Sequence, residues 1–157
     1  MATTAALEFL NGLAPDEAGA VLALATRRRL EPGTVLFQLG DDAGSLYLIE
    51  RGRIALTLPM QVHGREQDVM VEERTAGQTV GWSALIPTHH FTLKATAQVE
   101  TEVLAISREA LQAHLAARPA VGHTLTVNLA SVIGQRLQVF QAMWLREMQR
   151  VVEQRSS

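Results

Sequence analysis

Apolar and polar residues alternate with a period of two along much of the middle of the chain. In the clearest case, residues 91–99, every second residue is apolar: Phe91, Leu93, Ala95, Ala97 and Val99. Successive side chains of a β-strand point to opposite faces, so this alternation predicts a long strand with Phe91 directed inward. The polar residues of the other face begin with Thr92 and include Lys94.

Shorter apolar runs, separated by turn residues, precede and follow this strand. They predict at least seven short strands, over residues 34–37, 45–50, 53–58, 69–74, 78–80, 91–99 and 102–106. Arg51-Gly52 predicts a hairpin between the second and third of them, and the polar residues 61–67 predict a loop tip. Short strands at this spacing indicate a mostly β fold, an antiparallel β jelly roll or barrel, with flanking helices.

Helical patterns lie on both sides of the predicted strands. Residues 7–30 are predicted to be helical, with Pro15 at a first helical position and three arginines, 27–29, at the end, where cations offset the helix dipole. We interpret these arginines as solvated surface rather than as a phosphate-binding patch, because the chain as a whole leans acidic. Ser107 is the predicted N-cap of a helix that continues to about Ala117.

Pro119 opens a second predicted helix, which runs to about Gln154. Seven apolar residues recur along it at spacings of three and four and therefore share one face: Leu129, Ile133, Leu137, Phe140, Trp144, Met148 and Val151. At ~1.5 Å per residue this helix spans roughly 50 Å, which is more than a small barrel covers. The helix either packs wholly on its own barrel or pairs with a second copy, and we favour a homodimer through paired helices.

The composition fits a single domain that buries a core. Of the 157 residues, 47% are hydrophobic and 19% are charged, and the formal net charge is -2. We divide the domain into N-terminal helices (1–30), a β jelly roll (31–106) and C-terminal helices (107–157). The net charge gives the chain no broad electrostatic attraction to nucleic acid or to an anionic membrane. The absence of cysteine fits a cytoplasmic protein. No apolar run reaches the ~18 residues of a membrane span, and the start lacks a signal-peptide pattern.

The stretch from Thr75 to Val99 is the candidate site for a small molecule. Gly77 and Gly81 give the backbone freedom for a tight re-entry, and residues 83–86 are long enough for about one helical turn before a proline. A hollow should therefore form between this turn and the strand that follows. The amide groups at the start of the turn are a candidate anion cradle.

Glycines, apolar pairs and turn residues recur in a specific order along the chain. They are Pro32-Gly33, Leu36-Phe37, Gly40-Asp41, residues 46–49, Gly52, Gly77, Gly81, Ala84-Leu85 and residues 102–106. In this order and spacing the sequence resembles the cyclic nucleotide-binding domain family, which includes the sensory domains of the catabolite activator and anaerobic regulator class. The resemblance implies an eight-stranded jelly roll, a phosphate-binding cassette at the candidate site, and a long C-terminal helix that mediates dimerisation.

The cassette departs from the family pattern where ligand contacts are implied. That pattern is Gly-Glu-x-Ala-Leu followed by an arginine, with the glutamate on the ribose hydroxyl and the arginine on the cyclic phosphate. Here Trp82 stands at the glutamate position and Phe91 at the arginine position, and Phe140 stands where some bacterial members place small hydroxyl residues. Because phenylalanine offers a phosphate no charged hydrogen bond, we expect cyclic AMP and cyclic GMP to bind weakly or not at all, and no other cofactor.

The predicted ligand pocket is the cassette with its helix neighbour: Gly81, Trp82, Ser83, Ala84, Leu85, Phe91, Thr92 and Phe140. A metal or haem is disfavoured beside it, because His89 and His90 are adjacent and no nearby Cys, Asp or Glu completes a ligand set. A nucleophilic serine is disfavoured as well, because Ser83 lacks the second glycine of a nucleophile elbow and an acid to orient a base. We therefore predict no metal site and no enzyme.

The sequence predicts a non-enzymatic regulatory or sensory module of the cyclic nucleotide-binding fold. One alternative is a genuine cyclic nucleotide sensor. Others are a pocket for an apolar or aromatic metabolite and a structural interaction module whose pocket is plugged by its own rings. Few residues follow Val151, so we expect no helix-turn-helix and no direct DNA binding through one. Beside the homodimer, the partners expected are a protein or a small-molecule effector.

Overall fold

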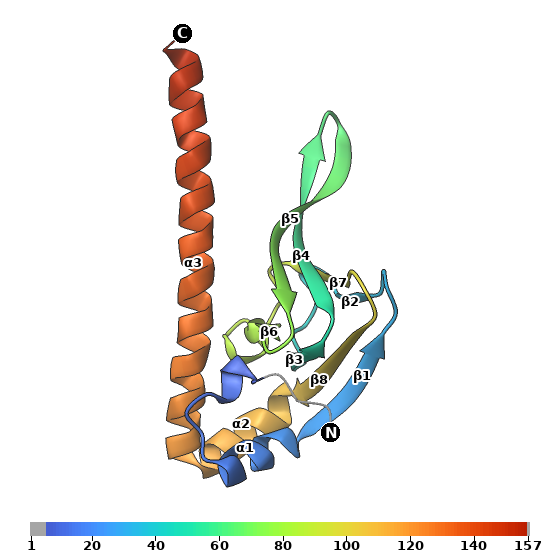
Figure 1. Ribbon diagram of the computed structural model, residues 1–157, viewed down its shortest axis with the longest axis vertical. Helices are drawn as coiled ribbons and strands as arrows, with labels where there is room; N and C mark the ends of the chain where they lie inside the picture. Colours follow the sequence, from blue (N-terminus) through green and yellow to red (C-terminus); the bar gives the residue numbers. More distant parts are fainter. Residues whose placement is uncertain (1–5, 157) are drawn as a thin grey trace.

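The structure, a computed structural model, describes residues 6–156 and places its strands in two antiparallel four-stranded sheets, ordered β1-β8-β3-β6 and β2-β7-β4-β5 (Figure 1). The strands are β1 (Ala25–Leu30), β2 (Val35–Phe37), β3 (Ser45–Arg51), β4 (Arg53–Val62), β5 (Arg65–Thr75), β6 (Thr79–Val80), β7 (Lys94–Ala97) and β8 (Thr101–Ser107). The helical elements are η1 (Glu8–Leu10), α1 (Pro15–Leu22), η2 (Trp82–Leu85), α2 (Arg108–Ala117) and α3 (Pro119–Arg155). The predicted antiparallel β fold with flanking helices and a long C-terminal helix is confirmed.

One apolar core joins the two sheets. Its fully buried side chains include Leu46, Leu48 and Ile49 on β3 and Ile54 and Leu56 on β4. Burial of apolar surface stabilises a fold by about 25 cal/mol per Å² removed from water, so this core is the main anchor of the strands. The cassette between β6 and β7 is built on its edge, because Ala84 and Phe91 belong to the same cluster.

The predicted hairpin of residues 45–50 and 53–58 is wrong. β3 pairs with β8 and β6, whereas β4 pairs with β5 and β7, so Arg51-Gly52 carries the chain from one sheet to the other. Gly52 has a φ of +104°, and a Cβ there would lie 2.7 Å from the carbonyl oxygen of Glu100. Only glycine permits this connection. The sequence did not distinguish the two arrangements, because two turn residues between apolar runs are expected both for a hairpin and for a crossing to the other sheet.

The predicted helix over residues 7–30 is wrong in its last part. Helix α1 ends earlier, and Ala25–Leu30 form β1, which pairs with β8 along its whole length. The arginines therefore lie on a strand, where Arg27 and Arg29 form exposed ion pairs with glutamates at 2.8 Å and 2.6 Å. Pairing with β8 provides hydrogen bonds for one side of this edge strand, and it outweighs the local helical pattern. The first five residues of the segment assigned to N-terminal helices (1–30) lie outside the described residues.

Three of the other strands, β4, β5 and β7, differ in extent from the prediction. β4 and β5 continue through the predicted loop tip at residues 61–67 and turn only at His63-Gly64, so they form a long hairpin that rises away from the rest of the sheet (Figure 1). The predicted strand over residues 91–99 is regular only over β7. Its alternation is confirmed, because Phe91 and Leu93 are buried like the alanines of β7.

The C-terminal helices agree with the prediction. The Ser107 hydroxyl accepts a hydrogen bond from the backbone amide of Ala110 at 3.0 Å and so caps α2. The first half of α3 lies against α2 and η1. Its second half stands apart from the sheets and rises somewhat above the tip of the β4–β5 hairpin (Figure 1). Within residues 6–156, no helix has both the length and the apolar character that crossing a membrane requires.

Candidate functional site

The cassette begins at a glycine that its neighbours leave no room to replace. Gly81 has a φ of +81° and stands just before η2. A Cβ at this position would lie 3.2 Å from Cε1 of Phe91 and 3.2 Å from Cδ2 of Tyr47. The left-handed backbone and the close rings both favour glycine, and this turn directs Trp82 and Ser83 to the site.

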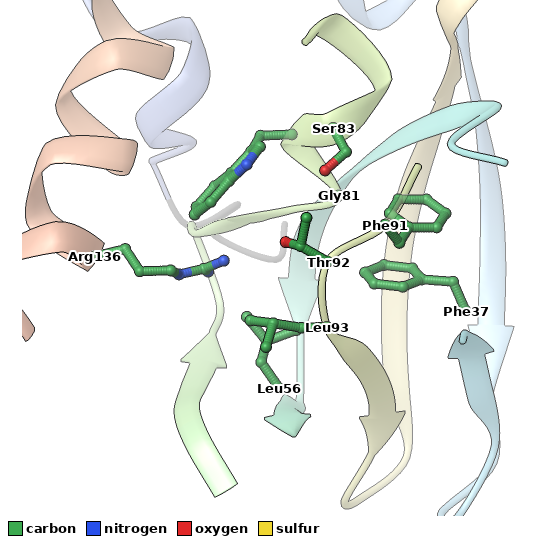
Figure 2. Close-up of a pocket in the computed structure, with 9 residues that line it drawn as sticks. Phe37, Leu56, Gly81, Ser83, Phe91, Thr92, Leu93 and Arg136 are labelled. Carbon is green, nitrogen blue, oxygen red and sulfur yellow. The ribbon is translucent and has the colours of Figure 1, made fainter. Parts of the chain in front are cut away.

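Stacked phenylalanine rings occupy the centre of the cassette. The rings of Phe91 and Phe37 lie 3.7 Å apart between centroids with planes 12° apart (Figure 2). Tyr47 also stacks with Phe37, at a centroid distance of 6.1 Å. Phe91 is only 4% exposed, which confirms the prediction that it points inward. Its backbone amide donates to the carbonyl oxygen of Asp41 at 2.9 Å, so a hydrogen bond fixes the main chain at Phe91 while the stack with Phe37 fixes its ring.

Little space remains beside these rings. The cavity at the cassette has a volume of about 10 Å³ and is lined by Phe37, Leu56, Gly81, Trp82, Ser83, Phe91, Thr92, Leu93 and Arg136. A space of this size holds roughly one water molecule, whereas pockets for small-molecule ligands have volumes of roughly 300–1,000 Å³. The residues present therefore do not fit a whole cyclic nucleotide in this arrangement.

An arginine from α3 reaches the edge of this cavity. Arg136 is 8% exposed, its Nε donates to Oε2 of Glu72 at 2.7 Å, and its Cζ lies 3.7 Å from the centre of the Trp82 ring. In Figure 2 the guanidinium extends from α3 toward Thr92, on the side of the site opposite Phe37. Burial lowers the pKa of Arg136 from its ordinary value, and the charge of Glu72 opposes that shift.

Arg136 belongs to a chain of alternating charges. The other carboxylate oxygen of Glu72 accepts a hydrogen bond from Arg74 at 2.9 Å, and Arg74 also pairs with Glu8 of η1. Arg74 is 2% exposed and donates from Nε to the carbonyl oxygen of Thr79 at 3.2 Å. Each buried guanidinium thus has a carboxylate partner, which offsets the cost of removing it from water. The network connects η1, β5, β6 and α3 around the cassette.

The structure brings together most of the residues predicted for the pocket. Five of them line the cavity: Gly81, Trp82, Ser83, Phe91 and Thr92. Ala84 and Leu85 belong to the same turn as Trp82 and Ser83. Ala84 is part of the apolar core, and Leu85 packs against it. Phe140 does not line it. Its ring is 38% exposed and lies one helical turn beyond Arg136 on α3.

Arg136 is the site residue that the sequence reasoning missed. The buried face of α3 consists of Val121, Leu125, Leu129, Val132 and Arg136, which recur at spacings of four, four, three and four. This stripe is shifted from the one predicted, because the two share only Leu129. Arg136 occupies the next position of an otherwise apolar helical stripe, and this was the signal that an arginine lies in the interior.

The other polar candidates have local partners. Lys94 binds Asp68 at 2.7 Å, and Nδ1 of His89 lies 3.3 Å from the carbonyl oxygen of Ser83. Among residues 6–156, no three His, Cys, Asp or Glu side chains come close enough to hold a metal ion. The geometry thus supplies packing and a charged edge to the cassette rather than a ligand set for a metal.

The predicted dimerisation stripe divides into two parts. Leu129 is buried in the core and Ile133 packs against it, but Leu137 and Trp144 are 58% and 62% exposed. Phe140 and Met148 are exposed as well. The barrel therefore covers only the first part of the stripe, and the distal part of α3 presents large apolar side chains to solvent in a single copy of the chain.

The fold is a jelly roll with a cassette between β6 and β7 and a long C-terminal helix. The model of the cyclic nucleotide-binding domain matches residues 27–118. This chain belongs to the cyclic nucleotide-binding domain family.

Several bacterial proteins are similar to this chain. The chain is similar to the Cyclic AMP receptor protein of Thermus thermophilus, with 30% identity over 129 residues, which are 82% of this chain and 56% of that protein. The crystal structure of the Catabolite Activator Protein of Thermus thermophilus has a TM-score of 0.72 at 28% identity and covers 90% of this chain and 63% of its own. The c-di-GMP responsive regulator CLP of Xanthomonas campestris has a TM-score of 0.75 at 20% identity, and the match covers 85% of this chain and 64% of that one. At this identity the similarity shows the fold alone. The chain thus spans little more than half of its curated relative.

Proposed function

We propose that this protein is a non-enzymatic regulatory module of the cyclic nucleotide-binding fold in which cyclic nucleotides bind weakly or not at all. The observation that carries the proposal is the stacked pair of Phe91 and Phe37, which fills the corner where the family pattern calls for an arginine. A cavity of about 10 Å³ beside this pair supports it.

The energetic argument follows from the chemistry of these side chains. A phosphate buried against phenylalanine lacks the bidentate charged hydrogen bonds that an arginine provides, and burying an unpaired anion costs several kcal/mol. Admitting a nucleotide also requires separating Phe91 from Phe37, which exposes apolar surface. Both terms disfavour the ligand, and the backbone amides of η2 recover only part of the loss.

The regulatory part of the proposal rests on α3. Its distal half carries Leu137, Trp144 and Leu145 at 58%, 62% and 60% exposure. Exposed apolar side chains along one helix favour pairing with a second copy, so we propose a homodimer through α3. In such a dimer, the contact of Arg136 with Trp82 connects the pairing helix to the cassette.

A genuine cyclic nucleotide sensor is the second candidate. It is favoured by the 30% identity to a protein named Cyclic AMP receptor protein. In this case Phe91 moves out of the site and Arg136 takes part in holding the ligand. A pocket for an apolar or aromatic metabolite is a third candidate, supported by the rings of Phe37, Trp82 and Phe91 around the cavity.

A thermal-shift screen against cyclic nucleotides and small aromatic compounds separates these candidates. A ligand that binds only the folded state raises its stability by about 2.7 kcal/mol at a hundredfold excess over its Kd. The proposal predicts no shift of the melting temperature with cyclic AMP or cyclic GMP at about 10 µM, well below the ~100 µM limit expected for their affinity. A clear rise with either nucleotide favours the sensor, and a rise with an aromatic compound alone favours the metabolite pocket.

A further inference from the structure

We propose that Met148, on the distal half of α3, is an oxidation site at which a hydroperoxide converts the thioether to a sulfoxide and so weakens the pairing of two copies of the chain. This inference rests on the proposed function, because it assigns a form of regulation to the α3 pairing proposed there. It concerns the distal part of the helix alone and needs no ligand in the cassette.

The first argument is the distribution of methionine in the fold. Four methionines lie within residues 6–156, at positions 60, 70, 143 and 148, and their exposed fractions range from 37% to 48%. None of the buried core residues in this range is a methionine. Methionine is usually among the more deeply buried residue types, so its restriction to the surface is unusual. A polar oxygen on any of these sulfurs would therefore leave the packing of the core intact.

The second argument is the position of Met148 on α3. The exposed residues Phe140, Trp144 and Met148 follow one another at spacings of four and share the face on which we propose pairing. Met143 lies five residues before Met148, which places it about 140° away around the helix. The other two methionines lie on the β4–β5 hairpin, a separate projection of the molecule (Figure 1). Of the four sulfurs, that of Met148 is therefore the one that pairing buries most completely.

The third argument is the chemistry of the thioether. The sulfur of Met148 attacks one oxygen of hydrogen peroxide, an S–O bond forms and the O–O bond breaks. The departing hydroxide takes the proton of the transferred hydroxyl and leaves as water, so the sulfur is oxidised by two electrons and the peroxide is reduced. The sulfoxide is polar, and methionine sulfoxide reductases return it to the thioether. The chain has no cysteine, so no thiol of its own competes for the oxidant.

Oxidation and pairing oppose each other at this residue. In a single copy, the Met148 side chain is 39% exposed, so a small oxidant reaches it. In a pair, the same side chain lies within an apolar stripe, where a sulfoxide loses its hydrogen bonds to water. A symmetric pair contains two such groups, one from each copy. The sulfoxide therefore favours the separated chains.

Treatment of the purified chain with hydrogen peroxide, followed by sedimentation velocity over a concentration series, tests the proposal. We expect the Kd of the dimer to rise at least about tenfold, which corresponds to about 1.4 kcal/mol. Peptide mass spectrometry should locate one added oxygen on Met148, and methionine sulfoxide reductases should restore the original Kd. The free energy of unfolding, measured below the dimer Kd, should stay the same because no core residue is modified.

Leucine variants assign the effect to one sulfur, because leucine keeps an apolar side chain of similar volume without the thioether. Each variant is compared with itself before and after peroxide treatment. The Kd of Met148→Leu should be unchanged by the treatment. Met143→Leu, on the same helix, and the double variant Met60→Leu/Met70→Leu, on the hairpin, are the matched controls. Both controls should keep the full tenfold response.

The proposal is overturned if peroxide leaves the Kd of the wild-type dimer unchanged, or if Met148→Leu responds as strongly as the wild type. Failure of the proposed function is recognised separately, from the untreated protein. An untreated chain that stays monomeric contradicts pairing through α3 and overturns this inference with it. An untreated dimer that peroxide does not weaken contradicts the oxidation site alone.

Discussion

Phe91 shows how one side chain can change the chemistry of a site without disturbing the fold around it. It keeps the inward direction that the alternating pattern predicts, and it is 4% exposed. Its ring stacks on Phe37, so the site gains apolar packing where the family pattern calls for a cation. The sequence was sufficient to predict this, because the parity of a strand and the identity of the residue are both local properties.

Replacing Phe91 with arginine should restore the family residue but destabilise the protein. We expect Phe91→Arg to lower the free energy of unfolding by about 3 kcal/mol or more, because the stacked ring is lost and a charge enters an apolar corner. Phe91→Leu, the control that remains apolar, should cost less than about 1.5 kcal/mol. Urea unfolding of the two variants measures this difference. Equal stability of Phe91→Arg and the wild type would mean that the corner already holds water or a counter-ion.

Arg136 marks the limit of residue-level prediction. Its own position is predictable from the buried period of α3, but its partners Glu72 and Trp82 lie on β5 and η2, far away in sequence. No local pattern connects these three residues, because the contacts form only when the helix lies across the finished sheet. The chemistry of the cassette edge was therefore not accessible from the sequence.

Among the elements, α3 has two roles along its length. Its first half completes the core through Val121, Leu125 and Leu129, and its second half leaves Trp144 and Leu145 exposed. The helical period predicted the whole element correctly, because caps and spacing act within one turn. The spacing of apolar residues alone did not indicate where the barrel stops covering the helix, since this depends on how far the folded sheets extend along α3.

Trp144→Glu tests the proposed role of the distal half. A buried interface tryptophan typically contributes 2 kcal/mol or more to association, so the dimer Kd should rise at least about 30-fold. Sedimentation velocity over a concentration series measures it. Gln135→Glu is the matched control, because it introduces the same glutamate at an exposed position. Residue 135 lies half a turn around α3 from Trp144 and therefore faces away from the proposed interface. A monomeric wild type, or an equal effect of both substitutions, would contradict pairing through this face.

At the scale of the whole molecule, the sequence predicted the architecture but not the strand partners. Local alternation located most of the strands, yet β3 and β4 belong to different sheets and Ala25–Leu30 is a strand rather than a helix. Both errors concern pairing between segments distant along the chain, which local propensity does not encode. The charge network of Glu8, Arg74, Glu72 and Arg136 has the same origin, since it joins η1, β5 and α3, three elements distant along the chain.

Calorimetric titration of the purified protein with cyclic AMP tests the central claim most directly. The claim is that aromatic packing has closed the corner where a phosphate would be neutralised. The account predicts an affinity weaker than ~100 µM, which corresponds to less than ~5.5 kcal/mol of binding free energy. A dissociation constant in the low micromolar range would contradict it, because such an affinity requires the stacked rings to separate and the phosphate to find a cationic partner.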